Sequence, residues 1–314
     1  MTERELGTTG ARVSSLCMGC WEIGGLSWGP MSSLDAVELV RAALDAGITT
    51  FDTAEQYGGG RSETILGKAL EGVRGETVLV TKVGYLPGSD GAQDLHLDYE
   101  PQDFSPSRIQ QACELSLRRL RTTYIDALLL HDPPLQIVRQ PEPFEALRRL
   151  QQAGKIRWWG VSASAPAAAE AIRLWNAPVV ESPFSLADDG VARHVLPLAA
   201  ERGTGVLARS PFGSGILMLD EAGIDRLPVT DWRRRESFRN RVRQLTGLRE
   251  RLQATADARD EPAHETAIRY VLGHEAVSCS IVGISSEQDI QRNAPAGDPP
   301  HLSAKEIAEL KGDT

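Results

Sequence analysis

Short runs of β-branched and aliphatic residues alternate along the chain with longer amphipathic segments. The short runs have the length and composition of buried parallel strands. They cover residues 15–20, 48–52, 77–83, 125–131, 155–162, 177–183, 204–211 and 277–284. The segments between them place apolar residues on one face, as helices that cover such a sheet do. They cover residues 33–46, 62–70, 105–120, 141–154, 165–175, 191–203 and 264–274, and a short helix is expected from Ser286.

Eight strand–helix units in sequence predict an α/β fold of the (β/α)₈ barrel type. A doubly wound sheet is the alternative, but it would carry a G-x-G-x-x-G fingerprint after its first strand. The chain has CMGCWEIGG at that place, so the fingerprint is missing. Because barrels of 314 residues are common as one unit, we expect a single domain over residues 1–314.

Several local features refine this expectation. Ser62 stands where a helix N-cap is expected, and Pro197 should kink or shorten the helix over 191–203. Two stretches, 85–104 and 212–262, interrupt the regular alternation after the third and seventh strands. Since both follow strands, both should overhang the carboxyl-end rim of the barrel, and the second should contain one amphipathic helix over roughly 237–258.

Charge and composition limit the kinds of partner that the protein is expected to bind. The formal net charge is −9 and the isoelectric point is near 5.3, which argues against a nucleic-acid partner. The first residues lack the layout of a signal peptide, and no apolar run is long enough to span a membrane. We therefore expect a cytoplasmic protein that acts on a small molecule away from membranes. The pattern gives no indication of an oligomeric state.

Cysteine and histidine positions do not indicate a metal site. Cys17 and Cys20 form a C-x-x-C, but they lie inside a strand pattern, and a second such pair is absent from the sequence. We expect them to be packing residues. The 6 histidines are scattered without the spacing of metal ligands.

Four polar side chains follow the ends of three consecutive predicted strands. Asp52 ends one strand and Tyr57 lies in the loop behind it, Lys82 comes near the end of the next strand, and His131 ends the third. Strands that end in titratable groups are typical of barrels that carry chemistry on their carboxyl-end loops. Each residue alone is more often structural, but a carboxylate, a phenol, an ammonium and an imidazole together form a proton-transfer set.

Five segments in this order and spacing resemble the aldo-keto reductase superfamily. They are FDTAEQYGGGRSETILGKAL, LVTKVG, LLLHDPP, GKIRWWGVSAS and RSPFGSGIL. The similarity is greatest to the bacterial branch that is related to potassium-channel β-subunits. The opening ERELGTTGARVSSLCMGCW resembles the amino-terminal hairpin of that family. The resemblance implies an NAD(P)H-dependent oxidoreductase that reduces an aldehyde or ketone to an alcohol, or oxidises an alcohol or sugar.

The resemblance also implies a catalytic tetrad of Asp52, Tyr57, Lys82 and His131. Tyr57 would be the general acid or base, and a neighbouring Lys82 ammonium would lower the pKa of its phenol. Asp52 would fix Lys82, and His131 would donate a hydrogen bond to the substrate oxygen. The hydride would come from the cofactor.

Cofactor contacts follow from the same resemblance. Ser162 matches a position that bonds the nicotinamide carboxamide, and Glu181 stands where the family usually has Gln. A carboxylate can accept from the amide NH₂ but cannot donate to its oxygen. Arg209 replaces a stacking aromatic, and a guanidinium can stack there too. The implied cofactor-binding residues are Cys20, Trp21, Asp52, Ser162, Glu181, Arg209, Ser210, Pro211, Phe212, Gly213, Gly215, Arg233, Arg234, Gly283, Ser285, Asp289, Arg292 and Asn293.

The choice between NADP(H) and NAD(H) rests on opposing signals. Asp289 near the ribose would repel a 2′-phosphate and accept from a 2′-hydroxyl, which favours NAD(H). Arg233, Arg234 and Arg235 stand where relatives place an arginine on that phosphate, although such a run can also be a solvated helix face. The sequence favours NADP(H), with NAD(H) as the alternative.

Two other functions compete with the reductase. A cofactor-sensing regulatory subunit without turnover is one, but such relatives generally lack the histidine that this chain has as His131. A metal-dependent hydrolase on the same fold is the other, and the scattered histidines argue against it. For the reductase, we expect Trp21, Trp28, Tyr57 and the 85–104 loop to line the substrate pocket.

Overall fold

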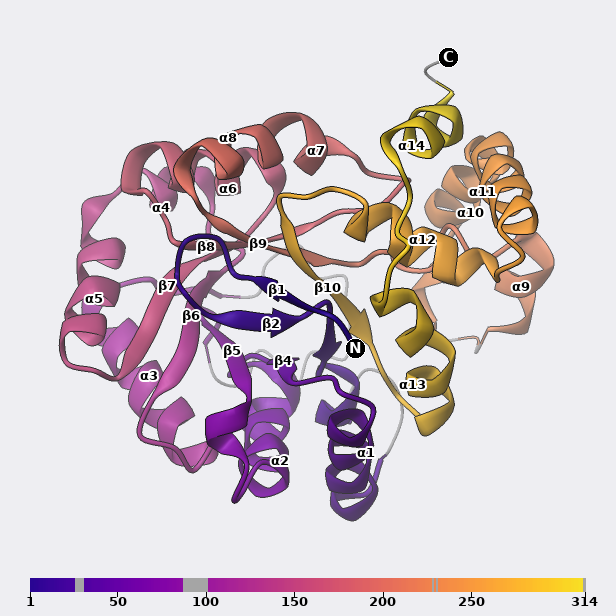
Figure 1. Cartoon of the computed structure of the whole chain (residues 1–314). Helices are drawn as coiled ribbons and strands as arrows, with labels where there is room; N and C mark the ends of the chain where they lie inside the picture. Colours follow the sequence, from indigo (N-terminus) through magenta and orange to yellow (C-terminus); the bar gives the residue numbers. More distant parts are fainter. Residues whose placement is uncertain (26–30, 87–100, 228, 230, 313–314) are drawn as a thin grey trace.

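Eight parallel strands close into a barrel in the computed structural model, which describes residues 1–25, 31–86, 101–227, 229 and 231–312 (Figure 1). Each strand pairs with its neighbours in the chain, and the last closes the barrel against the first. The strands are β3 (Leu16–Gly19), β4 (Thr50–Asp52), β5 (Val78–Val83), β6 (Ile125–His131), β7 (Ile156–Ser162), β8 (Val179–Pro183), β9 (Gly205–Arg209) and β10 (Val277–Gly283). The predicted barrel is confirmed, and each predicted strand range contains one of these strands.

A ring of helices covers the outside of the barrel (Figure 1). Those that follow successive strands are α1 (Ser33–Asp45), α2 (Arg61–Ala69), α3 (Pro106–Arg119), α5 (Pro141–Gln152), α6 (Ala165–Trp175), α8 (Leu196–Arg202), α12 (Ala263–Leu272) and α13 (Glu287–Asn293). Their apolar faces pack on the strands in one continuous core. Shorter or additional helices are α4 (Leu135–Val138), α7 (Gly190–His194), α9 (Glu221–Arg226), α10 (Glu236–Gln244), α11 (Thr246–Ala258) and α14 (Ala304–Lys311).

Of three local expectations about the helices, one is confirmed and two are wrong. Pro197 does divide the helix over 191–203, since α7 ends at His194 and α8 begins at Leu196. The expected cap at Ser62 is wrong, because α2 begins after Gly60 and the Ser62 hydroxyl instead donates to the carbonyl of Cys20 at 2.7 Å.

The single helix expected over 237–258 is also wrong. The chain leaves helical geometry at Leu245, with φ −98° and ψ 15°, so α10 and α11 are separate helices. They pack on different neighbours, because α10 contacts α9 whereas α11 lies against α12 and α14 (Figure 1). Tertiary packing therefore overrides a continuous helical pattern here.

An antiparallel hairpin closes the amino-terminal end of the barrel. It consists of β1 (Glu3–Glu5) and β2 (Arg12–Ser14), as the resemblance implied. Leu6 and Val13 are buried from this side among barrel-interior side chains that include Cys17 and Cys279. Cys17 and Cys20 are free and buried, as expected of cysteines that pack in the core. In the described part of the chain, no helix has the length and apolar character needed to cross a membrane.

Candidate active site

The carboxyl ends of the barrel strands bring the proton-transfer residues together. Asp52 ends β4, Lys82 is the penultimate residue of β5, and His131 ends β6. The register continues around the rim, since His131 is opposite Ser162 on β7 and Ser162 is opposite Glu181 on β8. Because all the strands are parallel, these side chains share one end of the barrel.

The ammonium of Lys82 is the centre of this cluster. The side chain is fully buried, and its Nζ donates to both carboxylate oxygens of Asp52 at 2.5 and 2.6 Å and to the Thr53 carbonyl at 3.1 Å. It lies 3.5 Å from the Tyr57 hydroxyl and 3.5 Å from Oε2 of Glu181. Burial lowers the pKa of Lys82, but the carboxylates of Asp52 and Glu181 outweigh it and hold the pKa above its usual range.

A glycine-rich turn after β4 positions Tyr57. Residues 58–60 are glycines with φ between 61° and 86°, a backbone region that other residues rarely adopt. A Cβ on Gly58 would lie 2.4 Å from the Gly24 carbonyl, so the turn also needs its missing side chain for close packing. The Tyr57 ring lies 5.9 Å from the His131 ring and 6.1 Å from that of Trp21, between centroids.

The titration of Tyr57 departs from the expectation. The sequence predicted that Lys82 lowers the phenol's pKa, and Lys82 does act in that direction. Burial is the larger effect, however, and together with Asp52 and Glu181 it raises the pKa above its usual value. Tyr57 is therefore a neutral phenol at neutral pH. His131 is uncharged as well, because burial and the nearby cations Lys82 and Arg209 hold its pKa well below the usual range.

Glu181 and Arg209 make contacts that the sequence did not predict. The Glu181 carboxylate accepts from the Ser162 hydroxyl at 2.9 Å and lies 3.7 Å from Nε of Arg209. Arg209, at the end of β9, also donates to Asp132 at 3.3 Å. Glu181 and Arg209, two of the residues that depart from the pattern implied by the resemblance, are thus neighbours of opposite charge.

The loop after β9 is a compact series of turns. Ser210, Gly213 and Gly215 have φ of 60°, 58° and 91°, and the Gly213 amide donates to the Ser210 carbonyl at 2.8 Å. Pro211 is buried and Phe212 half-buried within it. Arg233 reaches this loop, since a Cβ on Gly215 would lie 3.3 Å from its guanidinium.

The other residues assigned to the adenosine end are largely engaged within the protein. Asp289 accepts from the amide and hydroxyl of Ser285 at 2.9 and 2.8 Å. Arg233 pairs with Asp231 at 2.7 Å, and Arg234 donates to the carbonyls of residues 225 and 227. These contacts add no support to the expected preference for NADP(H). Arg292 and Asn293 end α13, with Asn293 buried.

Glu22 belongs to this region and was missed by the sequence analysis. Its carboxylate packs on Gly283, where a Cβ would lie 2.1 Å from Oε1. Burial raises the pKa of Glu22 to about 7, and the charge of Asp289 adds to the shift. No sequence pattern distinguishes this glutamate, because the glycine that it contacts lies near the other end of the chain.

The base of the 85–104 loop borders the site. Tyr85 pairs with Gln102 across an isolated β-bridge, and its ring lies 4.8 Å from that of His131. Gln102 donates to the His131 carbonyl at 3.0 Å. Trp28 and residues 87–100, which were also expected to line the pocket, lie outside the described residues.

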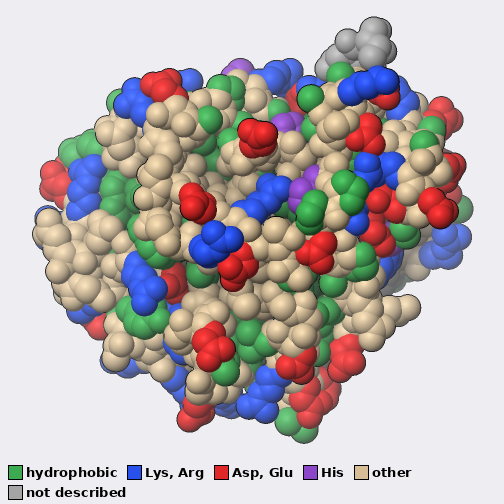
Figure 2. Space-filling view, viewed as in Figure 1, with side chains coloured by type: hydrophobic (Ala, Val, Ile, Leu, Met, Phe, Trp, Pro, Cys, Tyr) green, Lys and Arg blue, Asp and Glu red, His purple; other side chains and the backbone are tan. Residues whose placement is uncertain are grey.

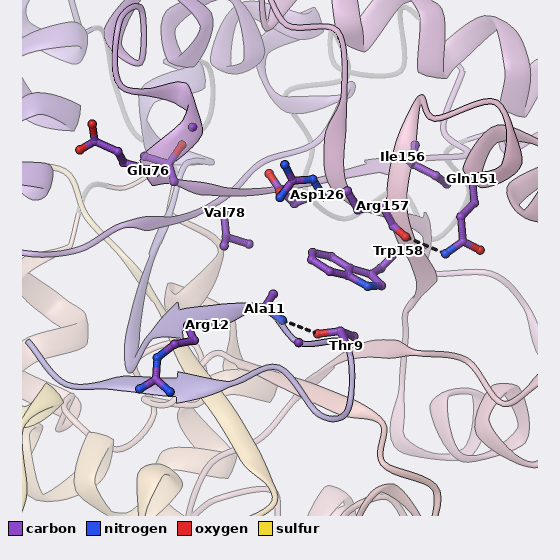
Figure 3. Close-up of a pocket in the computed structure, with 13 residues that line it drawn as sticks. Thr9, Ala11, Arg12, Glu76, Val78, Asp126, Gln151, Ile156, Arg157 and Trp158 are labelled. Atoms are coloured by element: carbon purple, nitrogen blue, oxygen red, sulfur yellow. Dashed lines mark hydrogen bonds and ion pairs between the residues drawn. The ribbon is translucent and has the colours of Figure 1, made fainter.

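A cavity of about 590 Å³ lies at the opposite, amino-terminal end of the barrel (Figure 3). It is bordered by the hairpin and by the first residues of β5, β6 and β7, including Val78, Asp126 and Trp158. Acidic and basic side chains are interspersed over this face of the molecule (Figure 2). None of the residues that line this cavity belongs to the cluster around Lys82, so the cavity is separate from the candidate active site.

Comparison with known proteins agrees with this arrangement. The family model described as the Aldo/keto reductase family matches residues 15–312, and the chain belongs to that family. It is an oxidoreductase, of the general type that acts on carbonyl compounds with a nicotinamide cofactor.

Three similar proteins illustrate the relationship. The uncharacterized oxidoreductase YqkF from Bacillus subtilis is 30% identical over 318 residues, which is 100% of this chain and 97% of that protein. The glycerol dehydrogenase AKR11B4 from Gluconobacter oxydans has a TM-score of 0.83 at 26% identity, covering 99% of this chain and 94% of that one. An aldo/keto reductase from Klebsiella pneumoniae in complex with NADP and acetate has a TM-score of 0.72 at 26% identity, covering 99% and 95%.

The raised pKa of Glu22 predicts a pH-dependent effect of Glu22→Gln on stability. The folded protein holds a proton on Glu22 that the unfolded chain loses near pH 4.5, so this group lowers the stability of the fold as pH rises from about 4.5 to about 7, with little further change above. The substitution should therefore raise the free energy of unfolding more at pH 8.5 than at pH 6, by about 1.4 kcal/mol, because about one pH unit of the linked range lies between these values. Urea unfolding of both proteins at the two pH values measures this difference. An equal effect at both pH values would contradict the assignment.

Proposed function

We propose that this protein reduces aldehydes or ketones to alcohols, or runs the reverse oxidation, with Tyr57 as the general acid and base. One observation carries the proposal: the buried Lys82 ammonium, fixed by Asp52, lies 3.5 Å from the Tyr57 hydroxyl at the carboxyl end of the barrel. A phenol beside a buried cation is suited to give up a proton and to take it back.

Each residue of the cluster has a separate task in the proposed reaction. Tyr57 is neutral at neutral pH, so it can donate its proton to an oxygen on which negative charge develops. Lys82 stabilises the phenolate that remains, and Asp52 fixes the position of Lys82. The uncharged His131 donates a hydrogen bond through its ring N–H, which orients the substrate oxygen beside Tyr57.

The residues beside Tyr57 fit a nicotinamide. When bound, the cofactor supplies or accepts the hydride. Arg209 presents a partly exposed guanidinium at the end of β9, and Glu181, which has no exposed surface, pairs with it from the neighbouring strand. The turns of residues 210–215, with Arg233 beside Gly215, fit the phosphates that such a cofactor carries.

At the adenosine end we propose that the protein discriminates weakly between NADP(H) and NAD(H). The NADP bound to the relative from Klebsiella pneumoniae favours NADP(H), whereas Arg233 beside the phosphate loop is already paired with Asp231. The Asp289 carboxylate on the Ser285 donors opposes a 2′-phosphate at the same place.

The substrate is proposed to be a small carbonyl compound, alcohol or sugar. The aromatic rings of Trp21, Tyr57 and Tyr85 around His131 provide apolar surface beside hydrogen-bonding groups, as such molecules need. The test is a panel of aldehydes, ketones and aldoses with NADPH and NADH, and of alcohols with the oxidised cofactors. Absorbance at the cofactor band reports turnover. Cofactor binding without turnover on any substrate would favour the regulatory-subunit alternative.

Tyr57→Phe should abolish most of the carbonyl reduction without affecting cofactor binding. The substitution keeps the ring and removes the proton, and general acid catalysis is typically worth about 10²–10⁴-fold in rate. Initial rates and fluorescence titration with NADPH and NADH measure the two effects. A variant that turns over at the wild-type rate would refute the role of Tyr57.

Asp289→Asn should strengthen binding of NADPH and leave NADH almost unchanged. The change removes a negative charge near the proposed 2′-phosphate site and keeps an oxygen that can accept from Ser285, so the dissociation constant for NADPH should fall by about 3–10-fold. The matched control is Glu287→Gln, which removes the same charge from an exposed position on α13. Equal effects on the two cofactors would show that Asp289 does not face the phosphate.

A further inference from the structure

Glu181 is a buried carboxylate that lies between two cations. Its side chain is fully buried, with the Ser162 hydroxyl donating to Oε1 at 2.9 Å and Nε of Arg209 at 3.7 Å from the same oxygen. Oε2 lies 3.5 Å from Nζ of Lys82 and makes no hydrogen bond to the described residues. A buried carboxylate is costly unless nearby cations offset its desolvation, and Lys82 and Arg209 are placed to do so.

Besides the Thr53 carbonyl, the ammonium of Lys82 therefore interacts with three titratable groups. Asp52 takes the short contacts, and the Tyr57 hydroxyl and Glu181 Oε2 lie at the same longer distance of 3.5 Å. The negative charge of Glu181 weakens the positive potential that Lys82 creates at the Tyr57 hydroxyl, so it disfavours a phenolate there. Burial raises the pKa of Tyr57, Lys82 lowers it, and the charge of Glu181 adds to the raising.

We propose that Glu181 is a positioning residue that acts through Lys82 to keep Tyr57 in its protonated form, and so displaces alcohol oxidation to higher pH. This inference rests on the proposed role of Tyr57 as acid and base. Oxidation needs the phenolate, because Tyr57 must then accept the alcohol proton, whereas reduction needs the phenol. Glu181 thus sets the pH at which alcohol oxidation replaces carbonyl reduction.

The remaining charged groups around Tyr57 set the background for this effect. Asp52 on β4 and Lys82 on β5 form the close pair, and His131 on β6 is uncharged. Arg209 on β9 opposes Glu181 and pairs with Asp132, the residue that follows β6. Near the loop behind β4, Glu55 is paired with Arg108 on α3 at 2.7 Å, so it adds little net charge. Glu181 and Arg209 are therefore the oppositely charged pair whose substitution should change the protonation of Tyr57 in opposite directions.

The experiment measures kcat/KM for alcohol oxidation against pH in the wild type and in Glu181→Gln, at saturating cofactor. The isosteric amide removes the charge and keeps the volume, so the oxidation profile should move to lower pH by about one unit. Oxidation at pH 7 should then be about tenfold faster, because each unit of pKa changes the phenolate fraction tenfold. The alkaline decline of carbonyl reduction should move in the same direction.

Two further variants distinguish charge from structure. Glu181→Asp keeps the charge and should retain most of the wild-type profile. Arg209→Gln removes the opposing cation and should move the profile to higher pH, and the double variant Glu181→Gln, Arg209→Gln should return it toward the wild type. Ultraviolet titration of tyrosine in each variant, with its Tyr57→Phe counterpart subtracted, follows the same phenol without any turnover.

The outcomes separate this inference from the proposed function. An enzyme that turns over, with an oxidation profile and a Tyr57 titration unchanged in Glu181→Gln, would overturn the role of Glu181 alone. Absence of turnover in the wild type on the whole substrate panel would overturn the proposed function, while the tyrosine titration would still report whether Glu181 raises the pKa of Tyr57.

Discussion

The buried ammonium of Lys82 is the interaction on which the rest of the site depends. A lysine with no exposed surface is costly unless its charge is compensated, and Asp52 and Glu181 compensate it from opposite parts of the barrel rim. The same ammonium lies beside the Tyr57 hydroxyl, so the group that the fold must stabilise is also the group that the chemistry needs. Its contacts reach β4, β8 and the turn that carries Tyr57, so the same interactions stabilise the fold and serve the proposed function.

Barrel closure makes this arrangement possible. Parallel strands deliver side chains from distant parts of the chain to one rim. Asp52, Lys82 and His131 lie at or next to the ends of their strands, and the register aligns His131 with Ser162 and Ser162 with Glu181. The hairpin seals the other end with Leu6 and Val13. Catalytic groups at the carboxyl ends and packing at the amino ends are the division of roles expected of this fold.

The sequence predicted the architecture well because the periodic apolar pattern reports burial directly. It also placed Asp52, Tyr57, Lys82 and His131 at one rim of the barrel, because the end of each apolar run marks the end of a strand. It did not reveal the ion pair of Glu181 with Arg209, which depends on side-chain geometry between neighbouring strands. Nor did it reveal that burial outweighs Lys82 in the pKa of Tyr57, or that Glu22 packs on Gly283. The break at Leu245 and the hydrogen bonds of Ser62 were missed because tertiary contacts decide them.

The coupling of Lys82 to Tyr57 is the central claim, and the pH profile of alcohol oxidation in Lys82→Met tests it most directly. Removing the cation should destabilise the phenolate, lower the rate at neutral pH and move the profile to higher pH by one unit or more. Because Lys82→Met leaves the Asp52 carboxylate buried without its partner, the double variant Asp52→Asn, Lys82→Met should be measured beside it. Folded variants with the wild-type profile and rate would contradict the account.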